Sequence, residues 1–298
     1  MSTETPLKRE IKEYRKKLEG AIDMQIHLAP DIVQRTSTES TFTRQAEQAG
    51  YFGYLSKCHH LTTAGRQMIL SSKVRFFGSI ALNNSMGGLN PYAVEVALKL
   101  GASEVWFPTL DAENHIKTFG QATLPTFKQL EGSASKRQAL PAKPISVLDP
   151  SGELKPEAMS VVEAMEGSNA ILGTGHLSLQ EANKVIEYAK KRGHKNFLIT
   201  HPEFKATFFS KEEQKRFSEQ GAYLEHCATV NYDPKLISEN IKYVGSSHCV
   251  LSSDAGQPLK GNPIDVLFDL VTALEEQGIN TSDIQRMIID NPRKLLGV

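Results

Sequence analysis

Short apolar runs alternate with longer amphipathic segments along the chain from residue 21 onward. Each run ends in one or two polar residues, and helix-capping signals punctuate the segments between runs. Strands joined by helical crossovers form a parallel sheet that is covered on both faces. Eight runs favour a closed α/β barrel, a (β/α)8 TIM-type fold, over an open doubly wound sheet. The eight predicted strands are AIDMQIH, YFGYLSKCHH, VRFFGSIALNN, ASEVWFPTLDAENH, AILGTGHLS, NFLITHPE, GAYLEHCA and CVLSSDAGQ.

The segments between the runs carry explicit helix signals. Asn90 precedes Pro91 as an N-cap, and the pair Ser178 and Glu181 has the spacing of a capping box. The segment SKEEQKRFSEQG repeats that box spacing. No G-x-G-x-x-G turn follows the first run, so the dinucleotide-binding signature that would favour an open sheet is missing.

The domain organisation follows from the same pattern. Residues 1–20 are predicted to form an N-terminal helical extension, and residues 21–298 a single barrel domain. Residues 116–150 are too long for a simple connection, so we expect an insertion or lid near the fourth strand, with a turn at DPSG.

Composition narrows the classes of partner. The 298 residues include 34 basic and 34 acidic side chains, which gives no reason to expect a nucleic acid or a membrane as partner. The three cysteines lie far apart in the sequence, so a disulfide framework or a zinc finger is not expected. We expect a cytoplasmic protein that acts on a small-molecule substrate, and a homo-oligomer is left open.

The first run, AIDMQIHLAPD, contains three alternating polar residues. Period-two spacing would place Asp23, Gln25 and His27 on one face of a strand. Polar groups in a buried strand require partners. The run therefore predicts a polar site that is completed by other strands.

Histidines gather at the ends of the predicted strands. Seven of the nine histidines lie in or directly after a run, and the last run ends in Asp254. The carboxyl ends of barrel strands meet on one face, where barrel active sites are built. Imidazoles and a carboxylate on one rim are ligands for zinc, manganese or iron. The seven histidines are His27, His59, His60, His115, His176, His201 and His226.

These motifs resemble the metal-dependent hydrolase superfamily, which includes the amidohydrolases and relatives of the polymerase-and-histidinol-phosphatase type. That superfamily has H-x-H on strand one, a histidine on each of strands five and six, and an aspartate on strand eight. The resemblance implies metal ligation by Gln25, His27, His176, His201 and Asp254. The ending DNPRKLLGV is similar to that of amidohydrolases, and LSKCHHLT is similar to the T-D-H-D segment of the phosphatase-type branch. HLAPD, KCHH and GGLNPYAVEVALKLGA together resemble an uncharacterised amidohydrolase-like family.

The chain departs from the superfamily pattern at Gln25, which stands where the first histidine is expected. A glutamine carbonyl is a weaker ligand than an imidazole, and the fourth strand ends in TLDAENH without an evident bridging lysine or glutamate. We therefore expect one divalent ion rather than two, with zinc first and manganese or iron as alternatives.

Lys57 on the second strand has several interpretations. It could pair with Asp23 or Glu225, bridge metal ions as a carboxylated lysine, attract an anionic substrate, or act as a Schiff-base nucleophile. The predicted catalytic residues are Asp254, Lys57, His59 and His60. The predicted substrate-binding residues are His115, Asn83 and Glu225, with Glu225 rather than His226 directed into the barrel.

The predicted activity is metal-dependent hydrolysis of a C–N or ester-type bond in a small molecule. A bound divalent ion lowers the pKa of water toward about 7, and Asp254 could both bind the ion and accept the proton. The alternatives are a metal-dependent lyase such as a decarboxylase, a metal-free enzyme that uses Lys57, and a barrel whose activity was lost at Gln25.

Overall fold

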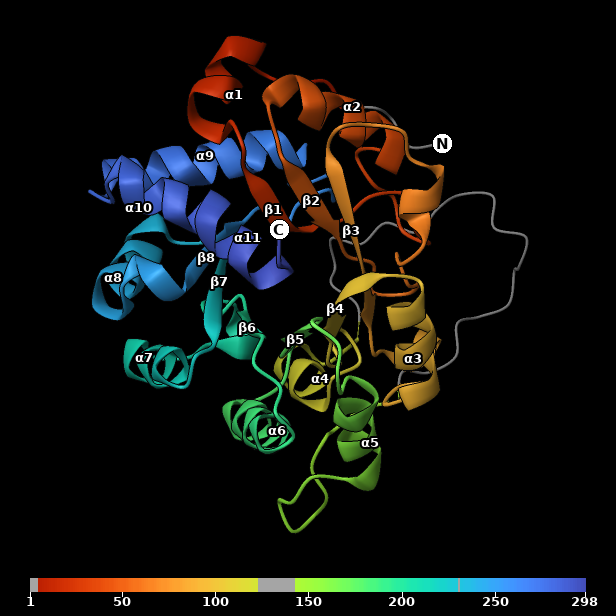
Figure 1. The fold of residues 1–298 in the computed structure, drawn as a ribbon. Coiled ribbons are helices and arrows are strands. Elements are labelled where there is room, and N and C mark those ends of the chain that lie inside the picture. Colours follow the sequence, from red (N-terminus) through yellow and green to blue (C-terminus); the bar gives the residue numbers. More distant parts are fainter. Residues whose placement is uncertain (1–4, 123–142, 230) are drawn as a thin grey trace.

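Eight parallel strands follow one another in sequence order around a nearly closed barrel, and the helices lie outside the ring of strands (Figure 1). The computed structural model describes residues 5–122, 143–229 and 231–298. A parallel bridge between Ile26 and Ala255 joins the first strand to the segment after the last one. The predicted (β/α)8 barrel is therefore confirmed. The strands are β1 (Ile22–Ile26), β2 (Gly53–Ser56), β3 (Arg75–Ala81), β4 (Ala102–Trp106), β5 (Ile171–Gly173), β6 (Phe197–Thr200), β7 (Tyr223–Cys227) and β8 (Cys249–Ser252).

The helices begin where the capping signals predict. Asn90 accepts hydrogen bonds from the backbone amides of Tyr92 and Ala93, and both predicted capping boxes form, at Ser178 and at Ser210. The α-helices are α1 (Ile11–Leu18), α2 (Glu39–Ala49), α3 (Pro91–Lys99), α4 (Glu113–Phe119), α5 (Pro156–Ala164), α6 (Leu179–Lys191), α7 (Lys211–Glu219), α8 (Pro234–Val244), α9 (Pro263–Glu276), α10 (Thr281–Gln285) and α11 (Asn291–Leu296). None of the helices in the described segments is long and apolar enough to span a bilayer.

Apolar side chains form two separate clusters. One cluster contains residues from all eight strands, such as Met24 and Trp106, and therefore fills the barrel interior. Leu295 of α11 belongs to this cluster, and the C-terminus lies near the centre of the ring in Figure 1. The other cluster joins the outer strand faces to the helices. With apolar residues filling part of the interior, polar chemistry is left to the strand ends.

Strand β1 does not alternate regularly. Met24 belongs to the interior cluster, whereas Ile26 belongs to the cluster that faces the helices. The pairing register with β2 shifts between Asp23 and Ile26, as at a β-bulge. The expectation that Asp23, Gln25 and His27 share one face is therefore wrong for Asp23, because it assumed an uninterrupted period of two. Gln25 and His27 do contact the same atom, Asp254 Oδ1.

The connection after β4 also differs from the sequence interpretation. The predicted strand ran as far as His115, but β4 ends at Trp106 and His115 lies on helix α4. A turn is present at residues 149–152, where the amide of Gly152 donates to the carbonyl of Asp149. Residues 123–142, most of the predicted insertion, lie outside the described residues.

Candidate active site

Four of the predicted metal ligands meet at the carboxyl ends of their strands. His27 follows β1, His176 lies in the loop after β5, His201 directly follows β6, and Asp254 lies just beyond β8. The ring centroids of His176 and His201 are 4.9 Å apart, and His27 Nε2 lies 3.0 Å from Asp254 Oδ1. All three imidazoles are buried. The barrel thus brings together residues that are separated by more than 200 positions in the sequence.

Asp254 is held by three polar groups. Its Oδ1 atom contacts Gln25 Nε2 at 2.7 Å and His27 Nε2 at 3.0 Å. Lys260, in the loop after β8, places its ammonium 3.3 Å from Oδ2 and also donates to the backbone carbonyl of Asp254. Burial alone would raise the pKa of Asp254, but Lys260, His27 and His201 hold it well below the usual range. Asp254 is therefore an ionised carboxylate.

The orientation of Gln25 bears on the expectation that its carbonyl serves as a metal ligand, which stays a prediction. Its amide nitrogen donates to the carboxylate of Asp254, and the reverse orientation would oppose two acceptor oxygens. Gln25 Oε1 is buried without a hydrogen-bond partner among the described residues. In this arrangement Gln25 positions Asp254 instead of offering an oxygen to the ion that Asp254 would bind.

Two of these residues have unusual backbone conformations. His201 has φ of 31° and Asp254 has φ of 44°, both in the positive region that non-glycine residues rarely adopt. Such conformations cost on the order of 1–3 kcal/mol and cluster at functional sites. Close by, a Cβ atom on Gly256 would lie 1.8 Å from the carbonyl oxygen of His27, so the loop after β8 can press against β1 only with glycine there.

Burial keeps the imidazoles of this rim neutral. It lowers the pKa of His27 to about 4 and that of His201 to about 3, and it holds the pKa of His176 well below the usual value. A neutral imidazole has one nitrogen with a free lone pair, which a metal ligand requires. We call His27, His176, His201 and Asp254, together with Gln25, the inner rim.

Two further histidines extend the inner rim. The His59 ring stacks on His27 with centroids 4.9 Å apart and lies 6.3 Å from the His176 ring. His115 reaches the same place from helix α4, with its Nδ1 atom 2.8 Å from His176 Nδ1. The sequence analysis placed His115 on the fourth strand, whereas it lies on α4. It still lies beside His176 at the carboxyl end of the barrel, because α4 begins soon after β4 ends.

Lys57 lies inside the barrel. Its Nζ atom is buried, lies 4.6 Å from the centroid of the Trp106 ring, and has no hydrogen-bond partner among the described residues. Burial lowers the pKa of Lys57, and the nearby carboxyl groups of Asp254, Glu225 and Glu104 oppose that effect. Burial also raises the pKa of Glu225 to about 8. Glu225 points inward as predicted, where Ser252 donates to it at 2.8 Å.

Asp23 does not brace Lys57. Its Oδ1 atom accepts hydrogen bonds from the backbone amides of Gln25 and Ser253. Burial raises the pKa of Asp23 to about 7. Asp23 therefore links β1 to the end of β8, which is a structural role.

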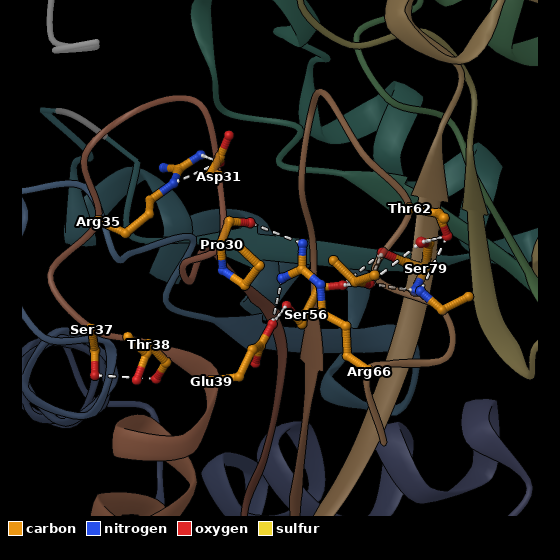
Figure 2. A network of polar contacts seen from close by, with 12 residues as sticks. Pro30, Asp31, Arg35, Ser37, Thr38, Glu39, Ser56, Thr62, Arg66 and Ser79 are labelled. Carbon is orange, nitrogen blue, oxygen red and sulfur yellow. Dashed lines mark hydrogen bonds and ion pairs between the residues drawn. The ribbon is translucent and has the colours of Figure 1, made fainter. Parts of the chain in front are cut away.

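A second polar cluster lies beside the inner rim, on the loops after β1 and β2. Asp31, Cys58 and His60 are the one group of three or more histidine, cysteine or acidic residues in the described segments whose donor atoms all lie within 4.8 Å of one another. Arg35 binds Asp31 Oδ2 through two nitrogens, at 2.8 and 2.5 Å (Figure 2), and His60 Nδ1 lies 3.1 Å from Asp31 Oδ1. We call these four residues the outer cluster.

The histidine of the outer cluster is charged, unlike the neutral imidazoles of the inner rim. Burial alone would lower the pKa of His60, but the hydrogen bonds that its ring makes to Asp31 and Cys58 raise it to about 9. A proton and the Arg35 guanidinium therefore already neutralise the carboxylate of Asp31. His60 was predicted to be catalytic together with His59, but it points to this cluster and not to Asp254.

Asn83 connects three loops instead of facing an open space. Its Oδ1 atom accepts from the backbone amides of Thr109 and Asp111, and its Nδ2 atom donates to the His59 carbonyl and to Thr109 Oγ1. These four bonds engage its whole amide. The prediction that Asn83 binds substrate stays a prediction, and the geometry favours a positioning task.

Glu203 does not orient His201, although it follows that residue closely in the sequence. It accepts hydrogen bonds from His226, Gln214 and Asn240, and so links β7 to helices α7 and α8. His226 accordingly points away from the barrel interior, opposite to Glu225.

Sequence reasoning missed four residues of the site. Glu104 shares the inward face of β4 with Trp106, and that spacing was a usable signal. Lys260, Thr109 and Thr207 lie on loops, and nothing in the local sequence indicates that they reach Asp254, His59 and His201.

Solved structures with a similar fold include an amidohydrolase, a probable dipeptidase and a decarboxylase. An amidohydrolase from Pseudomonas aeruginosa is 12% identical, with a TM-score of 0.62 over 96% of this chain and 97% of that chain. The probable dipeptidase PvdM from Pseudomonas aeruginosa is 11% identical, with a TM-score of 0.61 over 96% of both chains. A 2,6-dihydroxybenzoate decarboxylase from Rhizobium is 11% identical, with a TM-score of 0.55 over 94% and 99%. At these identities the similarity defines the fold class and no more.

A family model narrows the assignment. Residues 20–225 match DUF6282, a family of unknown function, and the chain belongs to that family. No curated protein sequence matches the chain. The expected resemblance to the amidohydrolases agrees with the fold, and the resemblance to the phosphatase-type branch stays a prediction.

Proposed function

We propose that the inner rim is the active site of a metal-dependent hydrolase that cleaves a C–N or ester-type bond in a small molecule. The observation that carries the proposal is the convergence of neutral, buried imidazoles on one ionised carboxylate at the carboxyl ends of the strands. Barrel enzymes place their chemistry on that face.

The donor set fits a divalent transition ion. His176 and His201 would supply nitrogen ligands and Asp254 an oxygen ligand, a combination that zinc accepts. His27 would join them on losing the Nε2 hydrogen that it donates to Asp254. No three of these four residues have donor atoms that all lie within 4.8 Å of one another, so the ligands would draw together on binding. Gln25 would position the carboxylate without binding the ion. We therefore expect one bound ion, because glutamine stands at position 25, where a second ion would need a histidine ligand.

The chain's own residues would divide the remaining tasks. A bound ion supplies Lewis acidity, which polarises a substrate oxygen and makes water nucleophilic at neutral pH. Lys260 keeps Asp254 ionised, Gln25 holds its carboxylate in place, and His59 and His115 lie beside His176. Burial of all these groups strengthens their electrostatic effect on a substrate.

Metal analysis with a matched pair of variants tests the proposal. The wild-type protein should carry about one equivalent of zinc, manganese or iron, and a chelator should remove both the metal and the activity. His201→Ala should lose the metal, whereas His60→Gln in the outer cluster should retain it. Metal loss in His60→Gln alone would move the site to the outer cluster and overturn the proposal.

A second candidate is a metal-dependent lyase such as a decarboxylase. Asp254 Oδ1 already accepts two hydrogen bonds and Oδ2 faces Lys260, so this carboxylate is a weak base toward water. Lyase chemistry does not require a proton to be taken from water. Substrate turnover in ¹⁸O-labelled water separates the two: hydrolysis incorporates the label, and decarboxylation releases carbon dioxide without incorporation.

A further inference from the structure

Two histidines of the site each contact a buried threonine hydroxyl. His201 Nδ1 lies 3.0 Å from Thr207 Oγ1, and His59 Nδ1 lies 2.9 Å from Thr109 Oγ1. A hydroxyl has one hydrogen to donate, while a neutral imidazole carries its hydrogen on either nitrogen. The second partner of each hydroxyl therefore decides which imidazole nitrogen is protonated.

The Thr207 hydroxyl sets the tautomer of His201 that metal ligation requires. Its second partner is the backbone carbonyl of His201, 2.8 Å away, which can only accept. The hydroxyl must donate there, so it accepts from Nδ1–H of His201. The lone pair of His201 is then on Nε2, as the proposed metal ligation requires.

The Thr109 hydroxyl has the opposite arrangement. Its second partner is Asn83 Nδ2, 2.7 Å away, which can only donate. The orientation of the Asn83 amide is fixed, because its Oδ1 atom accepts from the backbone amides of Thr109 and Asp111. Thr109 thus accepts from Asn83 and has its own hydrogen available for His59 Nδ1. Thr109 is fully buried, so leaving that hydrogen without an acceptor would cost on the order of 1–3 kcal/mol.

We infer that Thr109 and Asn83 hold His59 as the neutral Nε2–H tautomer, and that this N–H donates a hydrogen bond to the substrate oxygen on which negative charge develops. His59 is then a donor and not a metal ligand, because Nδ1 is occupied and Nε2 carries a hydrogen. Neutral imidazole acts in this way as an electrophile in other enzymes. Thr109 and Asn83 are positioning residues. The catalytic part of the inference rests on the proposed function.

The inference also limits the class of substrate. A fixed N–H donor beside His27 and His176 suits a carbonyl or carboxyl oxygen, as in an amide, an ester or a carboxylic acid. It cannot form this hydrogen bond with a substrate that lacks an acceptor oxygen at the reacting carbon.

Nuclear magnetic resonance tests the tautomer without any substrate. Long-range ¹H–¹⁵N spectra of protein labelled with ¹⁵N-histidine report which ring nitrogen carries the hydrogen, and the loss of signals in His59→Gln identifies His59. Wild type and Thr109→Ser should both show Nε2–H, and Thr109→Val, which lacks only the hydroxyl, should lose this preference. Nδ1–H in the wild type, or equal spectra for Thr109→Ser and Thr109→Val, would overturn the inference.

A zinc titration separates this inference from the proposed function. With one equivalent of zinc, His59 should keep its Nε2 hydrogen while the Nε2 signal of His201 changes. If no zinc binds, the proposed function fails while the tautomer assignment stands. If His59 loses its Nε2 hydrogen to zinc, the inference fails while the metal site stands.

Kinetics provide the third readout once a substrate is found. Thr109→Val should lower kcat on the order of 10-fold with KM little changed, and Thr109→Ser should recover most of the loss. Loss of a donor in the transition state lowers kcat, whereas a general packing defect would affect both variants through stability. Equal kcat in wild type and Thr109→Val contradicts the role of His59.

Discussion

The inner rim and the outer cluster each combine histidine with aspartate, yet their imidazoles are in opposite states. His59 and His60 are neighbours in the sequence, but burial keeps His59 neutral while Asp31 and Cys58 keep His60 charged. The inner carboxylate, Asp254, is shared among a lysine, a neutral histidine and an amide. The outer carboxylate, Asp31, is committed to a guanidinium and an imidazolium. Whether an imidazole is neutral, as metal binding requires, is thus decided by its burial and by the charges that surround it.

The largest expected effect comes from the inner carboxylate. Asp254→Asn keeps the shape of the side chain and removes its charge, so metal binding should fail and activity should fall about 10³-fold. Elemental analysis and turnover measure the two losses. Full activity in Asp254→Asn would show that the carboxylate is not part of the site.

The same substitution in the outer cluster should affect stability instead. Asp31→Asn removes the buried carboxylate that binds both the Arg35 guanidinium and the His60 imidazolium, which should lower the free energy of unfolding by about 3 kcal/mol. Denaturant unfolding measures it, and the metal content of the folded fraction is the control. An Asp31→Asn protein that is stable but free of metal would reverse the roles of the two regions.

His60 should make stability depend on pH. Its pKa is about 9 in the folded protein and 6.5 in the unfolded chain, so the stabilisation is complete below about pH 6.5 and disappears as the pH rises through 9. Between pH 6 and pH 10 the wild type should lose about 3 kcal/mol relative to His60→Gln. Parallel pH profiles for the two proteins would mean that His60 is neutral.

The smallest expected effect comes from Gln25. Gln25→His would restore the superfamily ligand and replace a donor to Asp254, so metal affinity should rise about 10-fold or a second equivalent should bind. Isothermal titration with zinc measures this change, and Gln25→Leu serves as the control that removes the hydrogen bond alone. Unchanged affinity and stoichiometry in Gln25→His would place residue 25 outside the site.

The fold was predictable because its signals are local. Apolar runs, the Asn90 cap and the Ser178–Glu181 box depend on residues only a few positions apart, and each was found where the sequence placed it. Period-two alternation in a regular strand predicted that Glu225 and His226 face opposite ways, and they do. Where the strand is irregular the same rule failed, since the bulge in β1 separates the faces of Met24 and Ile26.

The sequence by itself determined the eight-strand barrel and the identity of most polar residues on its carboxyl-terminal face. Only the tertiary structure decided the state of each of these residues. Lys260 and Thr207 reach Asp254 and His201 from loops, and Thr109 reaches His59 from 50 positions away. A protonation state is set by burial and by the nearest charges and hydrogen-bond partners in space. Those neighbours come from distant strands, so no local pattern of residues can encode them.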